Sequence, residues 1–235
     1  MRIDKLLSEL GICTRREAAK AAKSGGILVD GTPERDPSRH IDPDKNRISF
    51  LGREVTYQKY TYVMLNKPEG YVSATEDKSL PYVTELLPEE LRRRELFPVG
   101  RLDRDTVGLM ILTNNGSLAH SLLSPKRHVT KEYYFTSAVP LDRDAERAFT
   151  EGITLSDGYE CKPAELYLEA DRQSGRIVLT EGKYHQIKRM IASRDNRVTS
   201  LERISFGGIP LDKTLARGEW RYLTDEEIKL LEKQT

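Results

Sequence analysis

The residue with the clearest chemical potential is Asp103, which lies in a charged segment directly before an apolar run. Arg101 and Arg104 flank this carboxylate, and the run from Val107 to Leu112 contains no charged residue. A short apolar run predicts a buried strand, and Asn115-Gly116 predicts the turn that ends it. A carboxylate at the edge of a buried strand is partly desolvated, while adjacent cations keep it negatively charged. Such a carboxylate suits a nucleophile or a general base.

The same segment also has a simpler interpretation. Asp103 and Asp105 are good turn residues, and their arginine neighbours could simply remain in solvent. Composition alone favours this simpler interpretation, so the choice depends on the motifs elsewhere in the chain.

Three motifs follow one another along the chain, and the first of them contains this carboxylate. The first motif is Gly100-Arg101-Leu102-Asp103 with Thr106, Gly108-Leu109 and Thr113-Asn114-Asn115-Gly116. The second is Lys131-Glu132-Tyr133, and the third is Glu181-Gly182-Lys183-Tyr184-His185-Gln186-Ile187-Lys188-Arg189-Met190. An earlier Asn66-Lys67-Pro68-Glu69-Gly70 precedes them. In this order the motifs resemble those of RNA pseudouridine synthases, in particular the RsuA family that modifies ribosomal RNA.

The resemblance implies an isomerase that breaks the bond between uracil N1 and the ribose, turns the base over and joins C5 to the same sugar carbon. This reaction requires no cofactor and no metal. Because a side chain cannot attack a stacked base, the uridine must be flipped out of the RNA. The expected partner is ribosomal RNA. The short chain with its N-terminal module resembles enzymes that act on small-subunit RNA, so we expect that RNA or one of its assembly intermediates as the substrate.

The resemblance also assigns roles to individual side chains. Asp103 is the essential carboxylate, acting as nucleophile or as base, and Lys188 is its cationic partner. Tyr133 stacks on the flipped uracil and Leu179 packs against it. Arg101 contacts the RNA backbone or fills the gap left by the base. We interpret His185 as a helix-start residue with a structural hydrogen bond, and Lys67 and Pro68 as structural residues of a turn.

The first 58 residues are expected to form a small RNA-binding domain. Ile3, Leu6, Leu7 and Leu10 have helical spacing, and Thr14 with Glu17 forms a capping box before a second helix. Ile27-Leu28-Val29 followed by Asp30-Gly31 predicts a strand and a turn. The pattern resembles the ribosomal protein S-four-like module. The basic residues expected to meet RNA phosphates are Lys5, Arg15, Arg16, Lys20 and Lys23.

Residues 59–235 are expected to form the catalytic domain. Strands are predicted at 62–66, 107–112, 133–139, 164–170, 176–180, 197–206 and 215–223, and helices at 117–124, 142–149 and 183–193. Ser174-Gly175 predicts a turn between two of these strands, and Thr224 with Glu227 predicts a capping box at the start of a last helix. Runs of strands with intermittent helices predict an α+β fold with a mixed, mainly antiparallel sheet. Residues 89–94 are expected to form a solvated helix or loop. Lys126 and Arg127 form a basic cluster on a loop, where we expect a phosphate contact.

Composition narrows the possible classes of protein. The formal net charge is +1, with 32% charged and 37% hydrophobic residues, and no apolar run approaches the length of a membrane span. No secretory signal is apparent at the start, so we expect a cytoplasmic protein. We also expect a monomer. Cys13 and Cys161 are far apart, without other ligands at metal-binding spacing, and are interpreted as packing thiols.

Two other functions remain open from the sequence. The chain could be a non-catalytic RNA-binding factor of ribosome assembly that uses the same basic surfaces. A glycoside or nucleoside hydrolase also uses carboxylates at a sugar carbon, but it normally needs a second positioned carboxylate, and the sequence assigns none.

Overall fold

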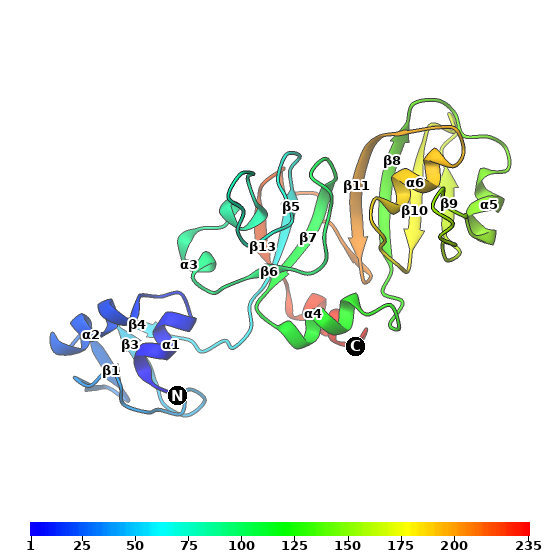
Figure 1. Cartoon of the computed structure of the whole chain (residues 1–235). Helices are drawn as coiled ribbons and strands as arrows, with labels where there is room; N and C mark the ends of the chain where they lie inside the picture. Colours follow the sequence, from blue (N-terminus) through cyan, green and yellow to red (C-terminus); the bar gives the residue numbers. More distant parts are fainter. The chain divides into compact units, whose positions relative to one another are not determined.

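The computed structural model describes all 235 residues, which form two compact units (Figure 1). The first unit comprises residues 1–61 and 87–96, and the second comprises residues 62–86 and 97–235. This division falls three residues after the boundary expected from the sequence. It also assigns the segment 87–96 to the first unit, which the sequence did not suggest.

The first unit packs two helices on a small antiparallel sheet. Helices α1 (Ile3–Glu9) and α2 (Arg15–Lys23) precede strands β1 (Ile27–Val29), β2 (Thr32–Pro33), β3 (Ile48–Phe50) and β4 (Arg53–Val55), in the order β2-β1-β3-β4. Its core consists of Ile3, Leu6, Leu7, Cys13, Ala18, Ala21, Ala22, Ile27, Val29, Ile41 and Ile48. The predicted capping box is confirmed: the Thr14 hydroxyl accepts from Glu17 N, and the Glu17 carboxylate accepts from Thr14 N.

The segment 89–94, predicted as a solvated helix or loop, contains helix α3 (Glu89–Arg92), whose Glu89, Glu90 and Arg92 are exposed. The prediction missed that Leu91 is almost fully buried, as are Leu87 and Leu96 on either side of the segment. Gly11 lies against this helix, because a Cβ atom there would approach Glu90 O to 2.0 Å, and its φ is +72°. Gly11 therefore ends the first helix and also admits the backbone of a distant segment.

The second unit contains one mixed sheet in the order β13-β5-β7-β11-β8-β10-β9, with β6 paired to β7 and β12 paired to β11. All pairs are antiparallel except β7 with β11, which confirms the predicted mixed, mainly antiparallel sheet. The strands are β5 (Tyr62–Lys67), β6 (Phe97–Pro98), β7 (Val107–Thr113), β8 (Lys131–Ser137), β9 (Glu165–Leu168), β10 (Ser174–Leu179), β11 (Val198–Phe206), β12 (Ile209–Pro210) and β13 (Trp220–Tyr222).

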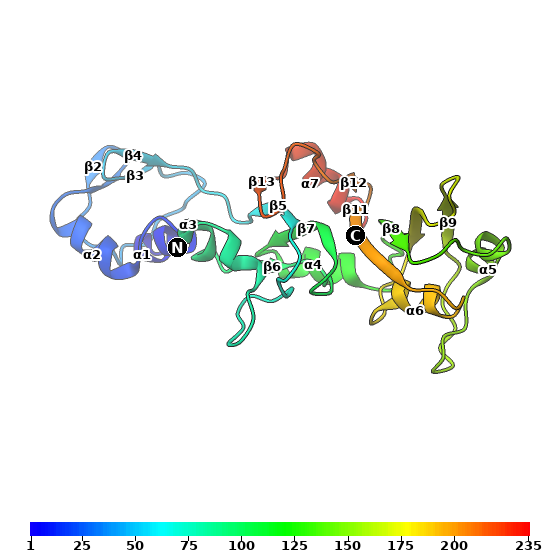
Figure 2. The same cartoon turned by 90° about the horizontal axis from the view of Figure 1, so that it is seen from above.

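Helices cover both sides of this sheet (Figure 2). Helix α6 (Gln186–Ala192) lies on one side of β8, β10 and β11, and α7 (Asp225–Glu232) lies on the other side of the sheet. The remaining helical elements are η1 (Val83–Leu86), α4 (Gly116–Leu123) and α5 (Ala145–Glu151). The capping box of Thr224 and Glu227 that the sequence predicts is present at the start of α7.

The hairpin between β9 and β10 turns earlier than predicted. The sequence suggested a turn at Ser174-Gly175, but Gly175 lies within β10 and pairs with Leu168. A Cβ atom on Gly175 would lie 2.3 Å from Tyr167 O, so the glycine admits a close approach of the neighbouring strand. The turn itself includes Arg172, whose φ is +55°. The predicted strand 215–223 is also shorter, since only Trp220–Tyr222 pairs with β5.

None of the helices has both the length and the apolar character that crossing a membrane requires. Both cysteines are buried and unpaired, as expected for packing thiols.

Candidate active site

Strand β7 positions the carboxylate that the sequence singles out. It lies between β5 and β11, and all its residues after Val107 are buried. Gly108 pairs with Arg203 of β11, where a Cβ atom would lie 2.4 Å from Arg203 O. This glycine therefore permits the one parallel pairing of the sheet, directly after the loop that carries Asp103.

Lys67, at the end of β5, holds the loop before β7 through hydrogen bonds to its backbone. Its side chain is fully buried, and its Nζ donates to the carbonyl oxygens of Thr106 (2.7 Å), Asp103 (3.0 Å), Pro68 (3.2 Å) and Arg104 (3.3 Å). Burial lowers the pKa of Lys67 to about 8, and the nearby carboxylates of Asp105 and Asp103 oppose that shift. The interpretation of Lys67 as a structural residue agrees with these contacts, but the segment it holds could not be read from the sequence.

Ser73 holds the same loop from a second side. Its hydroxyl donates to Leu102 O at 2.7 Å and accepts from Leu102 N at 2.9 Å. Both backbone groups of the residue before Asp103 are therefore fixed by one side chain. Sequence reasoning missed Ser73, because the segment 74–97 that follows it is polar and gives no sign of which part of the fold it meets.

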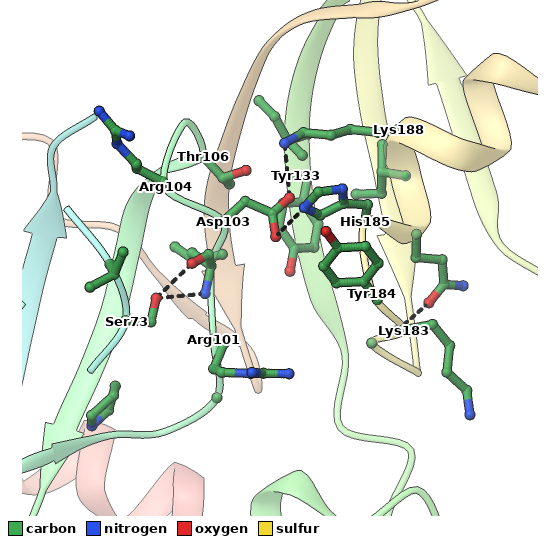
Figure 3. Close-up of a pocket in the computed structure, with 18 of the residues that line it drawn as sticks. Ser73, Arg101, Asp103, Arg104, Thr106, Tyr133, Lys183, Tyr184, His185 and Lys188 are labelled. Atoms are coloured by element: carbon green, nitrogen blue, oxygen red, sulfur yellow. Dashed lines mark hydrogen bonds and ion pairs between the residues drawn. The ribbon is translucent and has the colours of Figure 1, made fainter. Parts of the chain in front are cut away.

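Asp103 faces a cavity of about 800 Å³ and retains 27% of its side-chain exposure. Figure 3 shows the carboxylate pointing toward Lys188 of α6. The Lys188 Nζ lies 2.9 Å from Asp103 Oδ2 and 2.6 Å from Asp105 Oδ1. The loop and the helix, more than eighty residues apart in the chain, thus meet through one ammonium group.

Charge pairing governs the ionisation of this cluster. Burial acts to lower the pKa of Lys188, but its hydrogen bonds to Asp105 and Asp103 outweigh burial and raise that pKa. Burial likewise acts to raise the pKa of Asp105, and the Lys188 ammonium more than offsets it, so the pKa of Asp105 is lowered. At neutral pH Lys188 therefore carries its charge beside Asp103.

The other residues that the resemblance assigns to the site line the same cavity. Tyr133 on β8 and Leu179 at the end of β10 are both buried, with 9% and 3% exposure, whereas Arg101 is exposed at the edge. Figure 3 shows Arg101 below Asp103 on the same loop, and Tyr133 behind the carboxylate. The structure therefore brings Asp103, Tyr133, Lys188, Leu179 and Arg101 together around one cavity.

The loop between β10 and α6 is fixed by a buried carboxylate. Glu181 accepts hydrogen bonds from Gln186 Nε2 (2.6 Å), Tyr159 Oη (2.9 Å) and Lys162 N (2.9 Å). Gln186 in turn accepts from Lys183 N at 2.9 Å. Glu181 and Gln186 are motif residues to which the sequence gave no role, and their contacts show that they hold the third motif in position.

The prediction that His185 starts a helix is confirmed, because it is the N-cap residue of α6, but its side chain makes no capping hydrogen bond to that helix. Its Nε2 instead lies 3.5 Å from Asp103 Oδ1, on the carboxylate oxygen that Lys188 does not contact. The backbone of His185 has φ +50°, a left-handed conformation that is uncommon for residues other than glycine.

The basic residues expected to bind RNA phosphates are all exposed. Lys5 lies on α1, with Arg15, Arg16, Lys20 and Lys23 on α2, and Lys126 and Arg127 follow α4. Lys5 forms an ion pair with Glu9 at 3.5 Å, so part of its charge is neutralised within α1. None of these residues lines the cavity.

The chain contains no cluster of three or more His, Cys, Asp or Glu side chains arranged to hold a metal ion. The carboxylates of Asp103 and Asp105 share the ammonium group of Lys188.

The lowered pKa of Lys67 predicts how the free energy of unfolding changes with pH. Below about pH 8 the lysine is protonated in both the folded and unfolded chains, and the cost of its burial is fully present. Between about pH 8 and about pH 10.4 the unfolded chain binds more protons, so stability rises with pH by up to about 3 kcal/mol. The free energy of unfolding of the wild type, relative to that of Lys67→Met, should therefore increase over this interval in urea titrations.

The exposed residue Lys213 provides the matched control. Lys213→Met should change the free energy of unfolding by the same small amount at every pH in this interval. A constant difference between wild type and Lys67→Met would contradict the assignment of Lys67 as a buried ammonium group.

Comparison with known proteins agrees with this geometry. Residues 61–193 match the family model of RNA pseudouridylate synthase, and residues 1–45 match that of the S4 domain. The chain is 42% identical over 234 residues to the uncharacterised RNA pseudouridine synthase YtzG of Bacillus subtilis (strain 168), covering 98% of each chain. It is 38% identical to ribosomal small subunit pseudouridine synthase A of Escherichia coli (strain K12), covering 97% of this chain and 98% of the relative.

A solved structure gives the same result. A crystal structure of a pseudouridylate synthase superposes with a TM-score of 0.70 at 36% identity, covering 98% of this chain and 99% of that one. The predicted α+β fold, with a small N-terminal RNA-binding module ahead of a synthase domain, is confirmed. The chain belongs to the RNA pseudouridine synthase family and carries an N-terminal S4 domain.

Proposed function

We propose that this enzyme converts one uridine of small-subunit ribosomal RNA to pseudouridine, acting in the cytoplasm as a monomer and without a cofactor. The observation that carries the proposal is the Asp103 carboxylate, paired with Lys188 at 2.9 Å in a cavity whose other walls include Tyr133 and Leu179. The name of the Escherichia coli relative supports small-subunit RNA as the substrate.

In this proposal the cavity receives a uridine flipped out of the RNA. Asp103 acts at the ribose C1′ or on a proton beside it, either as nucleophile or as base. The N1–C1′ bond breaks, the C5–C1′ bond forms, and the proton lost from C5 is balanced by the one gained at N1. Lys188 orients Asp103, because its ammonium group contacts one carboxylate oxygen directly.

The remaining side chains would hold the uracil and the RNA. The ring of Tyr133 offers a stacking surface for the base, and Leu179 packs on it from another strand. Arg101 is exposed at the cavity edge, where its guanidinium can meet the RNA backbone or occupy the space that the base leaves. We propose domain limits of 1–58 and 59–235 for the RNA-binding and catalytic parts, with Lys5, Arg15, Arg16, Lys20, Lys23, Lys126 and Arg127 meeting phosphates.

The decisive experiment is to incubate the purified full chain, without additives, with ribosomal RNA from a strain that lacks it. Pseudouridine has the same mass as uridine, so the product is mapped by chemical labelling of pseudouridine followed by primer extension. The expected result is conversion of one uridine in small-subunit RNA. Conversion in another RNA would overturn the substrate assignment, and no conversion in any RNA would overturn the enzymatic proposal.

The exposed basic residues on α1 and α2 predict how RNA binding depends on salt concentration. A phosphate contact releases condensed counterions, so each contact contributes roughly one unit to the slope of log K against log salt concentration. Arg16→Ala should weaken binding to all RNA sequences alike and reduce that slope by about one unit. The measurement is a filter-binding titration of small-subunit RNA at several salt concentrations.

Arg147 on α5 is a suitable control, because it is exposed and forms only a long ion pair of 3.4 Å with Asp144. Arg147→Ala should leave the salt slope unchanged. An unchanged slope for Arg16→Ala would remove Arg16 from the RNA-binding surface.

A further inference from the structure

Two aromatic rings beside the catalytic carboxylate are stacked on each other, and the outer one is exposed. The rings of Tyr184 and His185 have centroids 3.8 Å apart and planes inclined by 18°. Both residues line the cavity, yet Tyr184 retains 73% of its exposure, more than any other large hydrophobic residue. In Figure 3 the stacked rings lie on the α6 side of Asp103, and Ser73 lies on the other side.

The stack has contacts that position it, although it projects into solvent. His185 is fixed by its contact with Asp103 at 3.5 Å and by its left-handed backbone conformation. The neighbouring backbone is fixed in turn by Glu181 and Gln186. A ring that is already ordered binds another ring with little further loss of side-chain entropy.

The exposure of the two tyrosines separates their roles. Tyr133 is 9% exposed, so only a base that has entered the cavity can reach its ring. The Tyr184 ring has one face covered by His185, and its other face is open to a base that remains outside. Exposed aromatic rings of this kind are typical stacking surfaces for unpaired nucleobases.

Two cationic residues line the same cavity as this ring. Lys183 precedes Tyr184, with its Nζ 4.7 Å from the centroid of the Tyr159 ring, and Arg101 is exposed at the edge of the same cavity. Such groups suit the phosphates of the nucleotides on either side of a flipped uridine. The surroundings of Tyr184 therefore match an RNA strand rather than a protein partner.

We propose that the Tyr184–His185 stack is a second nucleobase subsite, which binds the base of the nucleotide adjacent in the RNA to the flipped uridine. This subsite rests on the proposed function, because it requires the uridine to occupy the cavity beside Asp103. It gives the enzyme a contact with sequence flanking its target, and a purine, having the larger ring surface, is the preferred occupant.

The test uses the full chain and short RNAs that contain the uridine mapped above, with the 5′ or 3′ neighbour as adenine, uracil or an abasic ribose. Base–aromatic stacking is lost in Tyr184→Leu and kept in Tyr184→Phe. We expect Tyr184→Leu to raise KM by roughly 5- to 100-fold on the adenine RNA, with kcat unchanged and Tyr184→Phe close to wild type.

The decisive outcome is whether the effect of Tyr184→Leu on KM depends on the presence of the neighbouring base. On the RNA that is abasic at the contacted neighbour, Tyr184→Leu and wild type should have equal KM values. Fluorescence of 2-aminopurine at that neighbour should be quenched by wild type and not by Tyr184→Leu. Tyr222→Leu, which removes a tyrosine that is 50% exposed on β13, should behave as wild type throughout.

Other outcomes overturn the subsite. If Tyr184→Leu lowers kcat equally on every RNA, including both abasic ones, the ring contacts the flipped uracil itself. If its kinetics equal those of wild type while pseudouridine forms normally, the ring binds no base, and the proposed function stands without the subsite. If wild type forms no pseudouridine in ribosomal RNA, the proposed function fails instead.

Discussion

Asp103→Asn is expected to reduce pseudouridine formation by on the order of 10³-fold or more, with RNA affinity retained. Asparagine has the shape of aspartate but carries no negative charge, so it can neither attack the sugar nor accept a proton. Asp103 keeps 27% of its side-chain exposure and its backbone is held by Lys67, so the substitution should leave the fold intact. Single-turnover conversion and filter binding of the same RNA are the two measurements.

This comparison also separates an enzyme from an RNA-binding assembly factor. If Asp103→Asn restores ribosome assembly and RNA modification in a deletion strain as well as wild type does, the catalytic assignment is wrong. Asp105→Asn is the matched variant, because Asp105 shares Lys188 with Asp103. It leaves Asp103 in place, so we expect a reduction of less than about tenfold.

Lys188→Met is expected to lower kcat by roughly 10- to 100-fold, which corresponds to the loss of one charge-assisted hydrogen bond in the transition state. The substitution removes the ammonium group that contacts both Asp103 and Asp105, leaving two carboxylates close together without a cation. Their repulsion should move Asp103 from its position. Because the pKa of Lys188 is raised above 10.5, the wild-type pairing should persist until the pH exceeds that value.

Lys188→Arg keeps the positive charge and should recover most of the activity lost in Lys188→Met. Lys229→Met, an exposed lysine of helix α7, should have no effect on kcat. Equal activity of Lys188→Met and Lys188→Arg would show that the charge at this position has no part in the reaction.

The sequence predicts best where local patterns decide the structure. The apolar run 107–112 became the buried strand β7, and both capping boxes formed as predicted. These features depend on hydrophobic periodicity and on hydrogen bonds within a few residues. The motifs also selected the side chains that now line one cavity, although periodicity alone would not have brought Asp103 and Lys188 together.

The sequence predicts poorly where the structure around a residue depends on contacts with a distant part of the chain. Gly175 was read as a turn residue but admits a neighbouring strand, and Leu91 was read as part of a polar segment but is buried. His185 starts α6 as predicted, but its side chain contacts Asp103 on a distant loop. In each case the local pattern was correctly described, but a tertiary contact that the pattern does not reveal decided the role of the residue.

By itself, the sequence determined the fold class, the order of the main elements, the N-terminal RNA-binding module and the aspartate at the end of a charged loop. Only the tertiary structure decided how that loop is held, through Lys67 and Ser73, and which groups meet the carboxylate, namely Lys188 and His185. The physical reason is the range of the interactions. Helices, caps and turns form from interactions between near neighbours, whereas a buried ammonium group or an ion pair between a loop and a distant helix exists only after the sheet has brought them together.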